Sequence, residues 1–294
     1  MSSPDVLASS PSAQQREREL IEWLQSHDSL LLGFSGGVDS AYLACVAIEA
    51  VGAERFLAVI GRSASYPAEQ WQTARDVASR AGIEVLEVDT HEMDDPRYVA
   101  NPTNRCYFCK SELWSVLERV RTARGIATII DGTNADDLSD HRPGKKAATE
   151  QGIRSPLAEL GFTKDEIREL SRARGIPTWS QPSSPCLSSR LPYGTPVTVT
   201  RLSAIERAER ALRTLGVSGN LRVRHHGETA RVEMDLAELQ RWSDDANSAK
   251  ITEAVRRAGF ANVIVDPRGF RSGSLNVLAG IVTHPGTSAP FSGT

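Results

Sequence analysis

The sequence contains little that would tie the chain to a membrane or to a disulfide scaffold. Only four of its 294 residues are cysteine, and no apolar run approaches the roughly 18 residues needed to span a bilayer. The N-terminal residues have neither a basic start nor an apolar core, so we expect no secretory signal. Sparse cysteine in a chain of this length favours a reducing, cytoplasmic location, where clustered thiols serve metal binding or catalysis.

A strong charge of either sign is also missing. The net charge is −3, which gives no sign of a surface that coats nucleic acid, and we expect neither nucleic acid nor a membrane as a partner. Hydrophobic residues make up 40% and charged residues 24%, as is typical of a globular protein with a substantial core.

Apolar segments alternate with helical patterns along the first part of the chain. This alternation predicts an α/β fold, a Rossmann-like doubly wound parallel sheet. Helices are expected at residues 14–26, 38–51, 67–82, 110–124 and 163–175, and strands at 29–34, 55–61, 83–89 and 126–132, with a short one at 176–179.

The alternation stops at a proline-rich loop, residues 180–195. After it the pattern predicts a strand at 196–200, a helix, two strands joined by a turn at Gly227, a helical stretch and a last strand, which together suggest a smaller α+β domain. The predicted organisation is a disordered tail at 1–13, a first domain at 14–190, the α+β domain at 191–282 and a second disordered tail at 283–294.

A glycine loop, SGGVDS, lies between a predicted buried strand and a predicted helix. It is not a Walker loop, because no lysine follows the glycines. Adjacent glycines let backbone N–H groups approach an anion at a helix start, and the serines add hydroxyl donors. The aspartate suits either Mg²⁺ or a helix cap, and a plain capped turn is the alternative. The residues expected to contact a nucleotide are Ser35, Gly36, Gly37, Asp39 and Ser40.

This loop resembles the signature of the PP-loop (N-type) ATP pyrophosphatases. The resemblance implies that the loop holds the β- and γ-phosphates of ATP, which leave as pyrophosphate while AMP passes to a substrate oxygen. The segment DGTNADD resembles the second segment of that family, which implies that Asn134 and Asp137 face the nucleotide and its metal. By itself the segment also suits an ordinary helix start rich in Asn and Asp.

Three cysteines occur in unusual settings. Cys106 and Cys109 form a Cys-x2-Cys pair, and Cys186 lies in the proline-rich loop. The pattern permits a zinc site completed by His141, His225 or His226, a redox pair, or three thiolates that hold a 4Fe–4S cluster with one iron open to sulfide.

Basic residues accompany these cysteines in the sequence. Arg105, Lys110 and Arg190 are sequence neighbours of the three, and their charges are expected to favour thiolate over thiol. Cys45 follows the glycine loop among apolar residues, and we expect it to be an inert core residue.

The motifs taken together resemble the LarE family of ATP-dependent sulfur transferases, which act in the synthesis of the nickel-pincer nucleotide of lactate racemase. From about residue 17 to 280 the matching segments are SGGVDS, NRCYFCK, DGTNADD, HRPG, SPLAELGFTKDEIRELSRARGI, PCLSSR, VRHHGETARVEM and GFRSGS. The resemblance implies that ATP adenylates the carboxylates of pyridinium-3,5-dicarboxylate mononucleotide, and that sulfur then replaces AMP to give the dithiocarboxylate nucleotide.

The same resemblance implies two routes for sulfur. Some members sacrifice one cysteine, which leaves dehydroalanine, whereas others carry two further cysteines and bind a 4Fe–4S cluster. Cys186 matches the shared cysteine, and Cys106 with Cys109 indicates the cluster type. The implied cofactors are ATP, Mg²⁺ at Asp39 and a 4Fe–4S cluster on the three cysteines. The sulfide donor stays unknown, a homo-oligomer is expected, and a tRNA thiolase of the PP-loop class is the rival interpretation.

Arginine pairs near the C-terminus are the candidates for substrate binding. Arg222 and Arg224 are two residues apart on a predicted strand and so share a face, where paired guanidinium groups suit a phosphate or carboxylate. Solvated charge at a sheet edge is the alternative. Arg268 and Arg271 form a second candidate pair for an anion.

Overall fold

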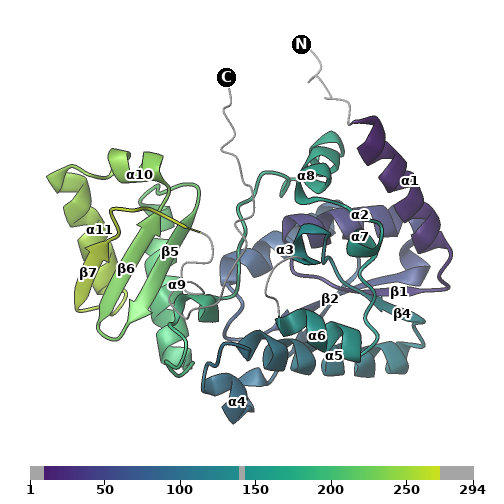
Figure 1. The fold of residues 1–294 in the computed structure, drawn as a ribbon, viewed down its shortest axis with the longest axis horizontal. Helices are drawn as coiled ribbons and strands as arrows, with labels where there is room; N and C mark the ends of the chain where they lie inside the picture. Colours follow the sequence, from purple (N-terminus) through teal and green to yellow (C-terminus); the bar gives the residue numbers. More distant parts are fainter. Residues whose placement is uncertain (1–9, 139–142, 272–294) are drawn as a thin grey trace.

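A computed structural model describes residues 10–138 and 143–271 of the chain. At its centre is a four-stranded parallel sheet with the strand order β3-β2-β1-β4 (Figure 1). The strands are β1 (Leu30–Gly33), β2 (Phe56–Arg62), β3 (Val85–Asp89) and β4 (Thr128–Ile130). The strand order reverses between β1 and β4, and open α/β sheets place their ligands at such a point, beyond the carboxyl ends of the strands.

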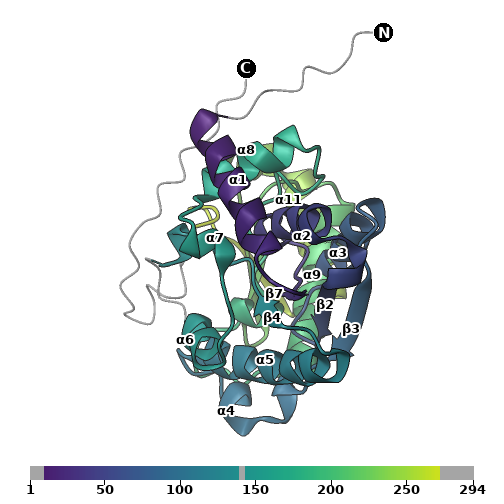
Figure 2. The same cartoon turned by 90° about the vertical axis from the view of Figure 1, so that its right-hand side faces the viewer.

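Helices cover both faces of this sheet. In Figure 2, α1, α2, α3 and α8 lie on one side of the strands and α5 and α6 on the other. The helices of this region are α1 (Pro11–Gln25), α2 (Val38–Val51), α3 (Ala68–Arg80), α4 (Pro96–Val99), α5 (Arg105–Arg124), α6 (Pro143–Glu150), α7 (Pro156–Glu159) and α8 (Lys164–Ala173). The doubly wound α/β fold predicted from the alternating pattern is confirmed.

Alternation along β1 explains why this strand is apolar throughout. Leu30 and Leu32 face the core formed with α1, α2, α3 and α8, whereas Leu31 between them faces the core formed with α5 and α6. A strand with both faces covered gains stability from every side chain, so its sequence shows no polar positions. The glycine loop therefore begins at the end of a strand whose three leucines are all fully buried.

The C-terminal part forms a separate three-stranded sheet with the order β5-β6-β7. Its elements are α9 (Val199–Thr214), β5 (Leu221–His226), β6 (Thr229–Met234), α10 (Leu236–Arg241), α11 (Asp245–Arg257) and β7 (Asn262–Val265). β5 and β6 pair antiparallel around Gly227, whose φ of 64° is the left-handed conformation that glycine adopts readily. The predicted turn is confirmed.

Two predicted elements, both strands, are wrong, and one predicted helix begins earlier than expected. Residues 176–179 form turns instead of a strand, and residues 196–200 run into α9, where the Thr198 hydroxyl caps the helix by accepting from the Arg201 N–H. Pro177 and Pro196 lack the N–H that a central strand needs. The helix is α5, which begins at Arg105 instead of residue 110, so both clustered cysteines of this segment are helical.

The two parts of the chain share a contact that the predicted boundary near residue 190 does not anticipate. Tyr98 of α4 and Leu187 belong to the same buried cluster as the side chains of α9, β5 and β6. Backbone hydrogen bonds join Val197 to Val99 and Gly194 to Asn101, each at 2.8 Å. We keep the division into domains at residue 190 as a proposal.

Several predictions fall on residues outside the described ranges. These are most of the N-terminal tail, the whole tail at 283–294, His141, and the end of the last matching segment after Arg271. Within residues 10–138 and 143–271, no helix combines the length and the apolar character needed to cross a membrane.

Candidate functional site

The loops after β1 and β4 meet at the carboxyl edge of the parallel sheet. Strand β1 pairs with β4, so the glycine loop and the segment 131–137 emerge side by side. A Cβ atom added to Gly132 would lie 2.9 Å from the backbone nitrogen of Ser40, which shows that the two loops touch. The two segments that the sequence assigns to a nucleotide are thus brought together.

The glycine loop is built around close packing at Gly36. Its φ is 67°, and a Cβ atom there would lie 2.5 Å from the Cβ of Ala74 on α3. The Ser35 and Ser40 hydroxyls are 3.1 Å apart, and the Ser40 hydroxyl donates to the carbonyl of Gly37. No described side chain caps α2 at Gly37, so the backbone N–H groups of its first turn face outward as donors for an anion.

Asp39 does not cap α2 either, because it faces the second loop. Its Oδ1 accepts from the side-chain amide of Asn134 at 3.2 Å, and Asn134 is almost fully buried. Asp137 instead exchanges hydrogen bonds with Asn134, accepting from its backbone N–H while donating its own backbone N–H to the amide oxygen. Asn134 therefore links the two acidic residues.

Lys164 is a functional candidate that the sequence reasoning missed. Its ammonium lies 2.5 Å from Oδ2 of Asp39. The Thr163–Glu166 capping box, at the start of the helix expected at residues 163–175, places Lys164 at the first position of α8, and α8 packs on α2. The glycine loop thus has a lysine after all, supplied from a distant helix. In the sequence, the capping box with a lysine directly after its first residue was the signal that could have identified Lys164 as a candidate.

The three clustered cysteines come from two segments that meet. Cys106 and Cys109 lie three apart on α5 and so share a helix face, and Cys186 immediately precedes the 3-10 helix Leu187–Arg190. Burial raises the pKa of the Cys109 thiol, and the negative charges of Glu92, Cys186 and Cys106 raise it further. Because such mutual effects fall off with distance, the three thiols lie in the same neighbourhood.

Cys106 differs from the expectation that basic neighbours favour its thiolate. Burial raises its pKa more than the charges of Arg105 and Lys110 lower it, although an Arg105 N–H lies 3.9 Å from its sulfur. The Cys106 side chain nevertheless keeps contact with solvent. Arg190 points to Glu209 instead, with which it forms a two-point ion pair at 2.9 Å.

The remaining sulfur and histidine groups do not complete a single-ion site. Among the residues that the structure describes, no three His, Cys, Asp or Glu side chains converge closely enough to bind one metal ion. His225 packs edge-on against Phe260. Cys45 packs against the core around α2, where burial raises its pKa to about 11, in agreement with an inert thiol.

A short segment after β2 joins the proline-rich loop that carries Cys186, called the cysteine loop from here on, to the glycine loop. The Leu187 backbone N–H, directly after Cys186, donates to the carbonyl of Ser65 at 2.8 Å. The next residue, Tyr66, donates its hydroxyl to the carbonyl of Ser35 at 2.8 Å. The cysteine loop and the glycine loop therefore lie in one region of the molecule.

The two candidate arginine pairs have different environments. Arg224 forms a buried ion pair with Glu233, whereas Arg222 is buried without an ion pair to any described carboxylate. Arg268 and Arg271 both face Asp266, together with Arg231. Asp266 offsets part of their charge, and the assignment of Arg268 and Arg271 to a second anion site stays a prediction.

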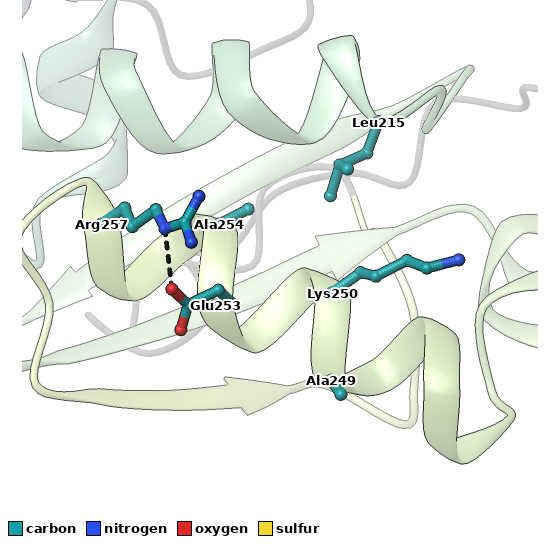
Figure 3. Close-up of a pocket in the computed structure, with 6 residues that line it drawn as sticks. All are labelled: Leu215, Ala249, Lys250, Glu253, Ala254 and Arg257. Atoms are coloured by element: carbon teal, nitrogen blue, oxygen red, sulfur yellow. Dashed lines mark hydrogen bonds and ion pairs between the residues drawn. The ribbon is translucent and has the colours of Figure 1, made fainter.

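A surface hollow of about 410 Å³ lies between α9 and α11, away from all these loops (Figure 3). It is lined by Leu215, Ala249, Lys250, Glu253, Ala254 and Arg257, and an ion pair joins Arg257 to Glu253 at 2.7 Å. None of these side chains belongs to the glycine loop, the cysteine loop or the arginine pairs. The hollow is thus separate from the candidate site.

Comparison with known proteins agrees with this geometry. Residues 17–101, which contain the glycine loop, match the NAD synthase family model. The chain is 43% identical to the protein slr1717 of Synechocystis sp. over 85% of its own length and 92% of that protein. It is 31% identical to the pyridinium-3,5-bisthiocarboxylic acid mononucleotide synthase of Lactiplantibacillus plantarum, over 89% of this chain and 94% of the synthase.

The chain belongs to this synthase family. Membership makes it an enzyme, and the match to the NAD synthase model implies a PP-loop that uses ATP and Mg²⁺. The chain is also 28% identical to a GMP synthase of Aeropyrum pernix over 69% of its own length but only 44% of that protein. The match to the pyridinium-3,5-bisthiocarboxylic acid mononucleotide synthase covers more of the chain and nearly the whole length of that protein.

Proposed function

We propose that the chain is an ATP-dependent sulfur transferase that converts pyridinium-3,5-dicarboxylate mononucleotide into its dithiocarboxylate. The observation that carries this proposal is the meeting of three thiols, from α5 and from the loop at Cys186, beside a PP-loop. A synthase that only joined ammonia to an adenylated acid would have no use for those thiols. Similarity to the L. plantarum enzyme along nearly the whole chain supports the same substrate.

The glycine loop and α8 would hold ATP for the first step. Backbone N–H groups at the start of α2 and the Ser35 and Ser40 hydroxyls would bind the β- and γ-phosphates, while Lys164 balances their charge. Mg²⁺ bound at Asp39 would release Lys164 toward the phosphates. The substrate carboxylate then attacks the α-phosphorus, the bond to the β-phosphate oxygen breaks, and pyrophosphate leaves with its electron pair.

The second step replaces AMP by sulfur. A sulfur nucleophile adds to the acyl carbon, the carbon–oxygen bond to AMP breaks, and the thiocarboxylate remains. Repetition at the second carboxylate gives the dithio product. AMP is a good leaving group because its phosphate carries the departing charge, so the thiols need only hold sulfur in place and exclude water.

The three thiols fit a 4Fe–4S cluster in their donor chemistry and their surroundings. Their charges act on one another, Arg105 and Lys110 would offset the negative charge of three thiolates, and the Cys106 side chain is open to solvent. When bound, such a cluster would leave one iron without a protein ligand and open to exchangeable sulfide. Cys106, Cys109 and Cys186 are the proposed ligands.

Arg222 is the better candidate for the anionic part of the substrate. Burial lowers its pKa to about 9, and the positive charges of Arg190, Arg224 and Arg213 act in the same direction, although Glu209 opposes them. A bound phosphate or carboxylate would relieve this excess of positive charge. Arg224 stays paired with Glu233 and would act more weakly.

The test is a reaction of anaerobically purified protein with ATP, Mg²⁺, sulfide and the dicarboxylate nucleotide. We expect AMP and pyrophosphate in equal amounts and a nucleotide in which sulfur has replaced oxygen. Isolated tRNA and other aromatic acids should not stimulate release of pyrophosphate. Pyrophosphate release with ammonia as the acceptor, and no sulfur in the product, would refute the proposal.

A further inference from the structure

The loop that carries Cys186 is held by arginine side chains that donate to its carbonyl groups. Residues 181–186 have no regular secondary structure, and residues 182–185 are exposed. Arg190 donates to the carbonyls of Pro185 at 2.6 Å and Cys186 at 3.1 Å, and Arg222 donates to the carbonyl of Ser183. The position of this loop thus depends on guanidinium groups rather than on a hydrophobic core.

Three of the arginines around the loop have other partners that fix them. Arg190 pairs with Glu209, and Arg224, which donates to the carbonyl of Ser189, pairs with Glu233. Arg105 donates both to the side chain of Asn101 and to the carbonyl of Ser188. These arginines are tied to the fold whether or not a ligand is present.

Arg222 is different because, within the described residues, the groups that accept its hydrogen bonds are neutral carbonyls. One N–H group donates to the carbonyl of Leu221 at 2.7 Å and another to that of Ser183, while the guanidinium lies 5.2 Å from the ring centre of Phe270. The side chain is only 5% exposed, and no described carboxylate pairs with it. A buried guanidinium without a counter-charge binds an oxyanion more strongly than a carbonyl.

We infer that Arg222 is a positioning residue for Cys186. When an oxyanion of the substrate binds the Arg222 guanidinium, the hydrogen bond from Arg222 to the Ser183 carbonyl is lost, and the cysteine loop is released. The inference rests on the proposed function only for the origin of the oxyanion, which is either the phosphate or a carboxylate of the nucleotide. Loss of one donor leaves residues 181–185 held at their ends, by Arg168 at the carbonyl of Gln181 and by Arg190 at that of Pro185. Cys186 can then move toward the activated carboxylate only when substrate is present.

The test measures how fast iodoacetamide alkylates Cys186 in the full-length protein, without ATP or sulfide. Peptide mass spectrometry resolves the four cysteines, and the half-buried Cys45, which packs against the core around α2, serves as the internal reference. Inorganic phosphate should raise the Cys186 rate about tenfold, the effect expected on losing one hydrogen bond from a charged donor. Nicotinate replaces phosphate in a second arm, so the two arms tell a phosphate from a carboxylate as the occupant.

Variants separate release of the loop from other effects of anions. Arg222→Gln should show the fast Cys186 rate without phosphate and no further response to it. Arg207→Gln is the matched control, because Arg207 donates to the carbonyl of Ala258 instead of to the cysteine loop, and it should keep the wild-type response. Circular dichroism of both variants checks that they are folded.

Several outcomes would overturn the inference. They are a wild-type Cys186 rate that neither anion changes, an equal response in Arg222→Gln, or a slow rate in that variant. Because the assay contains no ATP, its result is independent of catalysis. A protein that makes the thiolated nucleotide but shows no response refutes the inference alone, whereas a responsive protein that makes no such product refutes the proposed function alone.

Discussion

The Lys164 ammonium lies 2.5 Å from Oδ2 of Asp39, although 125 residues separate them in the chain. The pair joins the start of α8 to the start of α2, at the edge of the sheet where the two candidate nucleotide loops meet. A carboxylate and an ammonium at this point suit opposite ends of the same ligand, because Mg²⁺ binds the first and phosphate the second.

Replacing Lys164 tests the phosphate role. Lys164→Met should lower kcat/KM for ATP by about 100-fold, since a charge-assisted contact to the leaving pyrophosphate is lost in the transition state. Lys164→Arg should restore part of the activity. The measurement is pyrophosphate release. Lys146→Met, at an exposed lysine that faces Glu150, is the control and should change nothing. Equal activity of Lys164→Met and wild type would contradict the assignment.

Gly36 tests the close packing of the glycine loop. Gly36→Ala should destabilise the protein by about 3 kcal/mol or more, because the methyl group would clash with Ala74 in a left-handed conformation. Gly82→Ala is the matched control: its φ of 66° is nearly the same, but a Cβ atom there meets nothing within 4 Å. Urea unfolding compares the two. Similar losses would show that packing at Gly36 is unimportant.

We expect substitution of Arg222 and of Arg268 to differ in their effect on substrate affinity. Arg222→Gln should raise KM for the dicarboxylate nucleotide by about 10-fold or more, since a buried cation for its oxyanion is lost. Arg268→Gln should leave KM within about twofold, because Arg268 interacts with Asp266 at 3.3 Å. Steady-state kinetics at saturating ATP decide. A larger effect at Arg268 than at Arg222 would reverse our assignment.

The lowered pKa of Asp266 leads to a prediction for how the free energy of unfolding changes in acid. Burial raises its pKa, but hydrogen bonds from the backbone of Arg268 and from the Arg231 and Arg268 guanidinium groups outweigh this and lower it to about 2. Since the folded pKa is below the ordinary 3.8, ionised Asp266 stabilises the fold above pH 3.8, and this contribution disappears as the pH falls toward 2. Screening of these charges by solvent limits the contribution of Asp266 to the free energy of unfolding to about 1 kcal/mol.

The measurement is urea unfolding between pH 7 and about pH 2, where the carboxylates titrate. Asp266→Asn should be less stable at pH 7 and should lose part of the acid-dependent decline. Asp89→Asn, at an exposed carboxylate that pairs with Arg62, serves as the control and should keep the wild-type profile. An unchanged acid profile in Asp266→Asn would contradict the lowered pKa.

The fold was largely predictable because its strands are apolar and its helices carry local signals. The buried run at Leu30–Gly33 and the capping box at Thr163 with Glu166 each specify their element without help from distant residues. Errors occurred where proline and β-branched residues imitate a strand, as at 196–200, because the capping hydrogen bond of Thr198 decides the outcome there. The early start of α5 was missed because Asn104 makes no capping hydrogen bond through its side chain.

The site was predictable only for residues that lie within motifs. The glycines and serines of the glycine loop are close in sequence, as are Cys106 and Cys109, and their spacing indicates their chemistry. Lys164 meets Asp39 only through tertiary folding, so the sequence alone does not show the added lysine. Arg268 lies two residues from Asp266, so this contact is local in the chain, but the sequence does not show that Arg231 shares the same carboxylate.

The most direct test of the account is the mass of the protein and of the nucleotide across successive turnovers, with iron measured beforehand. The account predicts an iron- and sulfide-containing protein that puts sulfur into the nucleotide, releases one AMP for each carboxylate converted, and keeps its own mass unchanged when sulfide is supplied. A protein that loses the mass of H₂S at Cys186 would contradict the role of the three thiols as a joint site, and a nucleotide that gains no sulfur would contradict the whole account.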